Sequence, residues 1–220
     1  MRAIICCGGE ASRWDGYLGY DKCFIPIDSE PLVYRTVRLL QKFNVFDIWC
    51  VLRTNFDVPG TRTMLTSPST LDTAKFTCTI PCWGQTDDLI ILFGDTYFSE
   101  DAIARITRGD PPITGFTAYG HLNKTSIKPY GEIYAVRFTD REGVQSALDK
   151  MVKFQQSHDG ATERQRPSGW NLYLRMAQLA LDEVSFDPRF FSELPEDDPT
   201  DDFDYPYDYD KWVKQWRSEC

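Results

Sequence analysis

The chain begins MRAIICCGGEASRW (residues 1–14), a short apolar run that ends at a pair of glycines. A short apolar run of this kind is typical of a buried strand. Gly8 and Gly9 then allow a tight turn, in which backbone N–H groups can approach an anion closely. Arg13 and Lys22 follow and could hold phosphate oxygens. The stretch therefore predicts either a plain turn or a phosphate-binding loop.

The rest of the chain predicts an α/β fold. Further apolar, β-rich runs suggest strands, and periodic apolar stripes between the first of them suggest helices. Strands are expected at residues 3–7, 47–52, 89–93, 113–119 and 133–138, and helices at residues 31–43, 70–79, 99–107, 142–156, 168–181 and 207–217. This alternation favours a Rossmann-like, mainly parallel central sheet with helices on both faces. The ligand crevice of such a sheet lies beyond the carboxyl ends of its strands, where the first loop is placed.

Length and composition favour one soluble domain over residues 1–220. No apolar run approaches the ~18 residues of a membrane span, and the pattern of a signal peptide is missing, so we expect a cytoplasmic protein with no membrane partner. The net charge of −9 disfavours nucleic acid as a partner. The seven cysteines form no CxxC pair, which disfavours a zinc site and suggests small buried side chains in a reducing compartment.

The first loop resembles a known signature. The segment from Gly8 to Arg13, followed by Asp21-Lys22 and an apolar run, is similar to the GGxGTR and PK motifs of nucleotidyltransferases of the sugar-phosphate pyrophosphorylase type. These proteins have the nucleotide-diphospho-sugar transferase fold. Ala11 replaces a glycine of the signature, Ser12 replaces the threonine but keeps the hydroxyl, and Asp21 replaces the proline before the lysine.

Three later segments follow in the order of the same family. Residues 69–74 resemble the GTA segment beside the base and ribose, with Asp72 in place of glycine. Residues 89–95 end in Gly-Asp, where the family places a metal-binding aspartate, and residues 202–209 resemble the DIDTPEDY segment that supplies a second one. The resemblance extends from residue 1 to about residue 215, although each motif is degenerate.

The resemblance implies a role for particular residues. Lys22 and Arg13 would be the catalytic cations, and Asp95 and Asp204 would bind Mg²⁺. The nucleotide would contact Gly8, Gly9, Glu10, Ser12 and Thr73. The acceptor would contact Gly131 and Glu132, which lie within residues 129–134, a segment similar to the family's acceptor strand.

The implied reaction joins a nucleoside monophosphate, taken from a nucleoside triphosphate, to a small phosphorylated acceptor, with release of pyrophosphate. A sugar 1-phosphate is the favoured acceptor. In such a transfer the protein positions two reactants and neutralises negative charge, and magnesium commonly assists. The sequence identifies neither the base nor the acceptor, and it leaves a monomer or a homodimer open.

Two other functions remain open. A GT-A-like glycosyltransferase using a nucleotide sugar usually carries Asp-x-Asp after the central strand, whereas this chain has Asp95-Thr96-Tyr97. A catalytically inactive nucleotide-binding relative is suggested by Ala11, Asp21 and Asp72.

Structural explanations also stay open for several residues. Asp95 could cap the helix expected at Ser99, and Asp204 could belong to a solvated acidic tail. The aromatic residues within that acidic run instead predict that residues 195–220 dock on the domain. Gly131 and Glu132 could simply begin a strand. Trp170 is expected to anchor a helix, and His121 and His158 are expected in polar loops without a catalytic role.

Overall fold

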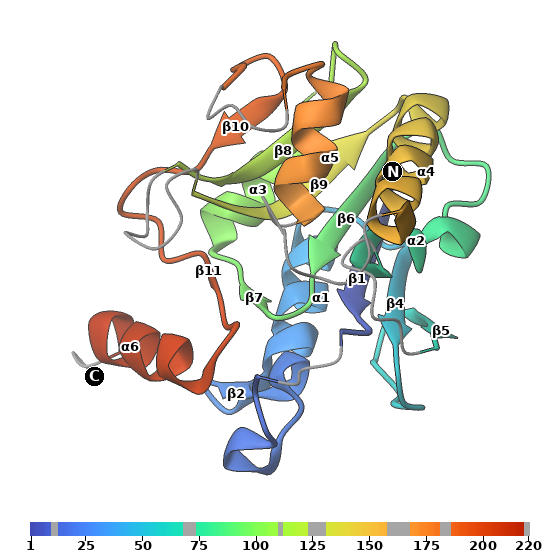
Figure 1. Cartoon of the computed structure of the whole chain (residues 1–220). Coiled ribbons are helices and arrows are strands. Elements are labelled where there is room, and N and C mark those ends of the chain that lie inside the picture. The colour runs from blue at the N-terminus through green and yellow to red at the C-terminus, as the bar shows by residue number, and fades with distance from the viewer. Residues whose placement is uncertain are drawn as a thin grey trace.

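A central sheet organises the computed structural model, which describes residues 1–9, 13–67, 74–109, 112–122, 131–157, 168–180 and 186–217 (Figure 1). Over these residues the sheet has seven strands in the order β10-β8-β9-β6-β1-β4-β5. They are β1 (Arg2–Cys7), β4 (Ile48–Leu52), β5 (Arg62–Leu65), β6 (Leu89–Phe93), β8 (Phe116–His121), β9 (Glu132–Phe138) and β10 (Phe191–Glu193). Only β9 runs antiparallel to its neighbours within this sheet, β6 and β8. The expected mainly parallel α/β fold is therefore confirmed.

Helices cover both faces of the sheet. The α-helices of the described residues are α1 (Leu32–Lys42), α2 (Ala74–Thr77), α3 (Glu100–Thr107), α4 (Arg141–Ser157), α5 (Ser168–Met176) and α6 (Pro206–Trp216). Short 3₁₀ turns lie at η1 (Tyr17–Gly19), η2 (Lys22–Phe24) and η3 (Ile80–Cys82). In Figure 1, α4 and α5 lie in front of the sheet, and α1 and α3 lie behind it. No described helix is both long enough and apolar enough to cross a bilayer.

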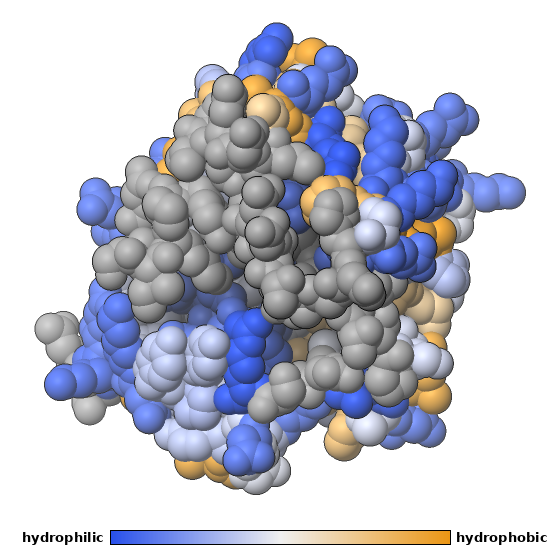
Figure 2. Space-filling view, in the orientation of Figure 1, coloured by the Kyte–Doolittle hydropathy of each residue, from blue (hydrophilic) through white to orange (hydrophobic). Residues whose placement is uncertain are grey.

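The strand β1 shows why both faces need cover. Its residues are buried and alternate between two cores: Ile4 packs with residues of α4 and α5, whereas Ile5 packs with residues of α1 and α3. This alternation is the period-2 pattern of a strand with two apolar faces. The outer surface over α4 is hydrophilic (Figure 2), since this helix turns Val144 and Leu148 inward.

A third apolar cluster joins the two ends of the chain. It contains Trp14, Ile25, Leu32, Phe203 and Trp212. Two short ladders support it: β7 (Thr96–Tyr97) pairs with β11 (Asp201–Asp202), and β2 (Pro26–Ile27) pairs with β3 (Glu30–Pro31), both antiparallel. The helix α6 consequently lies beside the loop that follows β1 (Figure 1).

Several element boundaries differ from the sequence prediction. The strand expected at residues 113–119 begins at Phe116, because a turn precedes it in which Ile113 is exposed and Gly115 has a φ of 78°. The helix expected at residues 168–181 ends at Met176, and Gln178 then adopts a φ of 57°. The helix expected at residues 70–79 is described only from residue 74, and it covers Ala74–Thr77. The edge strands β5 and β10 were not predicted.

Candidate active site

The ends of β1 and β6 meet closely at Gly94. Its backbone N–H donates to the carbonyl oxygen of Cys6 over 2.9 Å. A Cβ atom at this position would lie 2.8 Å from that oxygen and would also press on the Cys7 sulfur atom. Glycine therefore allows β6 to end against β1, and it places Asp95 beside the exit of the first strand.

A short capped turn presents Lys22. Asp21 precedes η2, and its carboxylate accepts a hydrogen bond of 3.2 Å from the backbone N–H of Cys23. Cys23 itself is buried in the apolar core that includes the inward-facing residues of α1. Asp21, which replaces a proline of the family signature, thus stabilises the turn that carries the lysine.

Lys22 forms the centre of a cluster of ion pairs. Its ammonium group contacts the carboxylate of Asp95, and it lies 3.9 Å from Oδ1 of Asp204. The other oxygen of Asp204 lies 3.0 Å from a guanidinium nitrogen of Arg13, 191 positions away in the sequence. The Lys22 side chain is 13% exposed and that of Arg13 is 44% exposed, so the cluster opens to solvent on the arginine side.

The electrostatic environment keeps the cluster charged. Burial alone would lower the pKa of Lys22, but the charges of Asp95 and Asp204 outweigh it and hold that pKa above its usual range. Burial alone would raise the pKa of Asp95, but Lys22 and Lys75 together hold it below its usual value. Lys75 was not singled out from the sequence, although it lies within a predicted helix. At neutral pH Asp95 is therefore ionised and Lys22 is protonated.

The C-terminal segment brings Asp204 to this position. The backbone N–H of Phe203 donates to the carbonyl oxygen of Asp95 over 2.9 Å, and the Phe203 ring is fully buried. The next residue therefore emerges beside Asp95. The following Tyr205 ring lies 5.3 Å from the Arg13 guanidinium carbon, a cation–π distance. Asp204 is held by a docked segment and is not part of a solvated tail.

Comparisons with known proteins support the fold. No family model matches the chain, and no curated protein matches it by sequence. Solved structures do match over nearly the whole chain. One is a putative glucose-1-phosphate thymidylyltransferase from Bacillus anthracis, with a TM-score of 0.61, 12% identity and coverage of 100% of this chain and 96% of that one.

Two further matches have related activities in their names. The CTP:phosphocholine cytidylyltransferase from Streptococcus pneumoniae has a TM-score of 0.57 and 15% identity, and the match covers 97% of this chain and 98% of that one. The inositol-1-phosphate CTP transferase from T. maritima has a TM-score of 0.61 and 13% identity, with coverage of 99% and 96%. The chain has the nucleotidyltransferase fold.

Within this nucleotidyltransferase fold, the two glycines of the first loop have different surroundings. A Cβ atom on Gly8 would lie 2.6 Å from the Thr66 side chain, whereas one on Gly9 would meet no atom of the described residues within 4 Å. The Gly9 carbonyl oxygen accepts a long hydrogen bond of 3.4 Å from Arg53. Gly8 is thus fixed by packing, and Gly9 is exposed. The other predicted nucleotide contacts, Glu10, Ser12 and Thr73, lie outside the described residues.

The predicted acceptor strand begins at the same end of the sheet as Asp95. Because β9 runs antiparallel to β6, its first residue, Glu132, lies near the end of β6 from which Asp95 follows. Gly131 has a φ of 80°, and its carbonyl oxygen accepts a hydrogen bond of 3.1 Å from the indole of Trp170, which is buried and anchors α5 as expected. The structure thus places Gly131 and Glu132 at the start of β9, at the same end of the sheet as Asp95.

The structure corrects two interpretations of single residues. Asp95 does not cap α3, because the hydroxyl of Ser99 accepts the hydrogen bond from the backbone N–H of Ala102 over 2.8 Å. His121 does not lie in a polar loop; it is the last residue of β8 and is buried, with its ring against Tyr134. His158 lies outside the described residues. The hydroxyl of Tyr134 donates to Asp201 over 3.2 Å, a contact that the sequence did not suggest.

The donor set of the cluster fits a magnesium ion. Asp95 and Asp204 both point their carboxylates at Lys22. Mg²⁺ in nucleotide sites commonly takes one or two carboxylates and completes its shell with phosphate oxygens and waters. Within the described part of the chain, no group of three or more His, Cys, Asp or Glu side chains gathers to form an all-protein metal cage. The two aspartates therefore suit a metal that is shared with a phosphorylated ligand.

Proposed function

We propose that the protein transfers a nucleoside monophosphate from a nucleoside triphosphate to a sugar 1-phosphate, with magnesium and with release of pyrophosphate. One observation carries the proposal. Lys22, Asp95 and Asp204 come from the first loop, the end of β6 and the C-terminal segment, and they meet in one ion-pair cluster at the carboxyl ends of parallel strands. This edge of an α/β sheet is where nucleotides bind.

The cationic side chains of the cluster have distinct tasks in this proposal. Lys22, which is largely buried and stays protonated, would hold the acceptor phosphate and the α-phosphate of the nucleotide close together. Arg13, which is more exposed and presents a planar fork, would bind the leaving β- and γ-phosphates. Positioning and charge neutralisation of this kind are the main demands of the reaction.

The carboxylates complete the site. Asp95 and Asp204 would hold magnesium, which when bound supplies positive charge to the phosphate oxygens. The open backbone at Gly9 would approach the phosphates, and Gly131 and Glu132 would contact the sugar. The comparisons support the general reaction class, because nucleotidyltransferases for glucose 1-phosphate and inositol 1-phosphate share the fold.

The alternative of a glycosyltransferase is not favoured by the structure. The position of the second aspartate in an Asp-x-Asp motif is occupied by Tyr97, which is buried against Trp212 with ring centroids 4.3 Å apart. A side chain in that place is not available to a metal ion. The substitution Asp21 was one reason to consider an inactive relative. It no longer supports that alternative, because Asp21 caps the turn that presents Lys22.

Pyrophosphate release tests the proposal. The four common nucleoside triphosphates would be combined with a panel of sugar 1-phosphates, inositol phosphate and choline phosphate, with and without magnesium. We expect one pairing to release pyrophosphate and to form the nucleotide-linked acceptor in equal amounts. Transfer of a sugar from a nucleotide sugar, without pyrophosphate, would instead establish a glycosyltransferase.

Two matched lysine substitutions distinguish a specific effect at the candidate site from a general loss of folded protein. Lys22→Ala removes the central cation and should abolish the release of pyrophosphate. Lys42→Ala removes an exposed lysine that pairs with Glu100, outside the cluster, and should leave the rate unchanged. Tight nucleotide binding without turnover across the whole panel would favour the inactive relative.

A further inference from the structure

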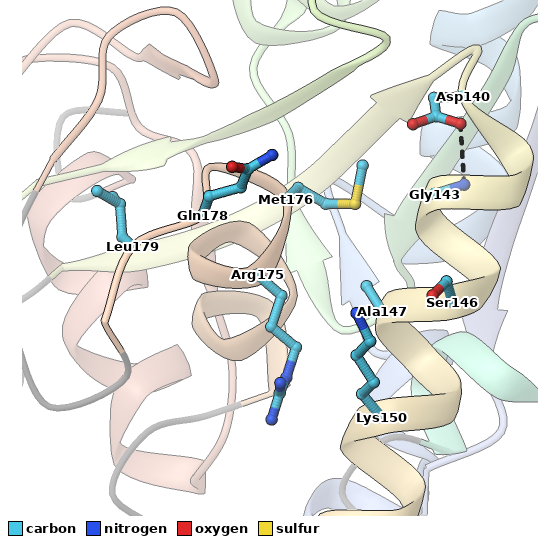
Figure 3. A pocket seen from close by; sticks show the side chains of 9 residues that line it. All are labelled: Asp140, Gly143, Ser146, Ala147, Lys150, Arg175, Met176, Gln178 and Leu179. Carbon is cyan, nitrogen blue, oxygen red and sulfur yellow. Dashed lines mark hydrogen bonds between the residues drawn. The ribbon is translucent and has the colours of Figure 1, made fainter.

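A pocket lies between α4 and α5 (Figure 3). Its volume is about 440 Å³. It begins at Asp140, which follows the end of β9 beside the start of β6, and therefore at the opposite edge of the sheet from Asp95. The residues that line it are Asp140, Gly143, Ser146, Ala147, Lys150, Arg175, Met176, Gln178 and Leu179.

Two basic side chains of this pocket lack an acidic partner. Lys150 projects from α4 and Arg175 from α5, on the facing sides of the two helices (Figure 3). Neither forms a salt bridge with a carboxylate of the described residues. The Nε atom of Arg175 is buried and has no hydrogen-bond partner in that part of the structure, and burial lowers the pKa of this guanidinium. Burial of this atom without a partner costs free energy, and a negative charge beside the guanidinium would offset part of that cost.

The chemical character of the pocket lining changes along α4. Gly143, Ser146 and Lys150 are separated by three and four positions and therefore share one face of the helix. Ala147 and Met176 add apolar surface between them. At the far end, Oδ1 of Asp140 already accepts a hydrogen bond of 2.8 Å from the backbone N–H of Gly143. The pocket thus has a cationic end, a partly apolar middle and an end that can accept hydrogen bonds.

We propose that this pocket binds a small hydroxylated phosphate monoester, with its phosphate held between Arg175 and Lys150. A phosphate monoester carries nearly two negative charges at neutral pH, which matches two unpaired cations, whereas a carboxylate carries one. The planar guanidinium of Arg175 would bind phosphate oxygens through its terminal nitrogen atoms. The hydroxyl groups of the ligand would reach Ser146 and Asp140.

The size of the pocket agrees with such a ligand. Small-molecule sites commonly have volumes of about 300–1,000 Å³, and this pocket lies within that range. It is larger than a bare phosphate ion needs. The inference is independent of the proposed transfer reaction, because it uses no residue of the ion-pair cluster.

Calorimetric titration with glycerol 3-phosphate tests this inference. The full chain would carry Lys22→Ala, so that the main phosphate-binding cation of the candidate active site is absent. We expect saturable binding that weakens as salt is added. Arg175→Gln and Lys150→Gln should each weaken it by about tenfold or more, as is typical for loss of a charge-assisted hydrogen bond. Glycerate, which has a carboxylate in place of the phosphate, should bind more weakly than glycerol 3-phosphate.

A neighbouring lysine provides the control. Lys153→Gln removes one exposed charge from α4 outside the pocket and should leave the affinity within twofold of its parent. Lys150 is exposed, so its substitution tests the pocket even where Arg175→Gln fails to fold. The inference is overturned by an absence of saturable binding, by equal affinity in the Lys150 variant and its parent, or by glycerate binding as tightly as the phosphate ester.

Discussion

Trp212→Ala should reveal how strongly the C-terminal segment is docked. The indole is 2% exposed and packs on Tyr97 and Phe203, with ring centroids at 4.3 and 5.7 Å. Its Nε1–H donates to the carbonyl oxygen of Pro199 over 2.7 Å. Replacement of a buried tryptophan by alanine typically costs about 3–5 kcal/mol. We expect a loss of this size in the free energy of unfolding, because the cavity would lie between α6 and the rest of the domain.

Urea denaturation measures this loss, and two variants calibrate it. Trp212→Phe keeps most of the buried ring but loses the hydrogen bond, so we expect a loss of about 1–2 kcal/mol. Gln215→Ala changes an exposed position of the same helix and should alter stability by less than about 0.5 kcal/mol. A loss below about 1 kcal/mol for Trp212→Ala would refute the reasoning, since α6 would then contribute little to the folded state. An m-value that is the same for a variant and the wild type shows that the two proteins expose similar surface on unfolding, so that their free energies can be compared.

Three further predictions concern stability. Asp88→Ala leaves Arg137, which is 2% exposed, without its carboxylate partner, and should cost about 3–5 kcal/mol by urea unfolding. Gly94→Ala drives a methyl group against the backbone of β1 and should cost about 1–3 kcal/mol. Gly9→Ala, whose methyl group would meet no atom of the described residues within 4 Å, serves as its control in the same thermal-unfolding assay. Because the pKa of Asp95 is lowered in the folded protein, its stabilising effect is present above the unfolded-state pKa and disappears as the pH falls through the folded-state value. The stability difference between the wild type and Asp95→Asn, measured at a series of pH values, should therefore shrink below about pH 4; a constant difference would contradict this reasoning.

The central strands could be predicted because each is a continuous apolar run. Residues 3–7 and 89–93 are buried on both faces, and such runs indicate strands of a covered parallel sheet. The edge strand Arg62–Leu65 could not be predicted in this way, because its side chains are mostly exposed and it is held by pairing with β4. The three-residue strand Phe191–Glu193 likewise depends on pairing with β8. Long-range hydrogen bonds, and not local patterns, define these edges.

Part of the candidate site could also be predicted from the sequence. Asp95 follows the end of β6 and Lys22 lies in the loop that follows β1, so the topology of an α/β sheet predicts that both lie at the same end of the sheet. The aromatic residues among residues 195–220 predicted that this segment docks, and the family resemblance pointed to Asp204. The contact of Arg13 with Asp204, across 191 positions, was not predicted, because it depends on the detailed packing of α6. The pocket at Arg175 was also not predictable, because it arises from the way that two helices face each other.

The rate of pyrophosphate release by Asp204→Asn tests the central claim most directly. The claim is that a residue near the C-terminus completes a site built on the first loop. With the triphosphate and acceptor that support turnover, we expect this variant to lose activity by about 100-fold or more, as for removal of other preorganised charged or polar groups. Asp197→Asn, an exposed substitution in the same acidic run, should keep the wild-type rate. A wild-type rate for Asp204→Asn would contradict the account.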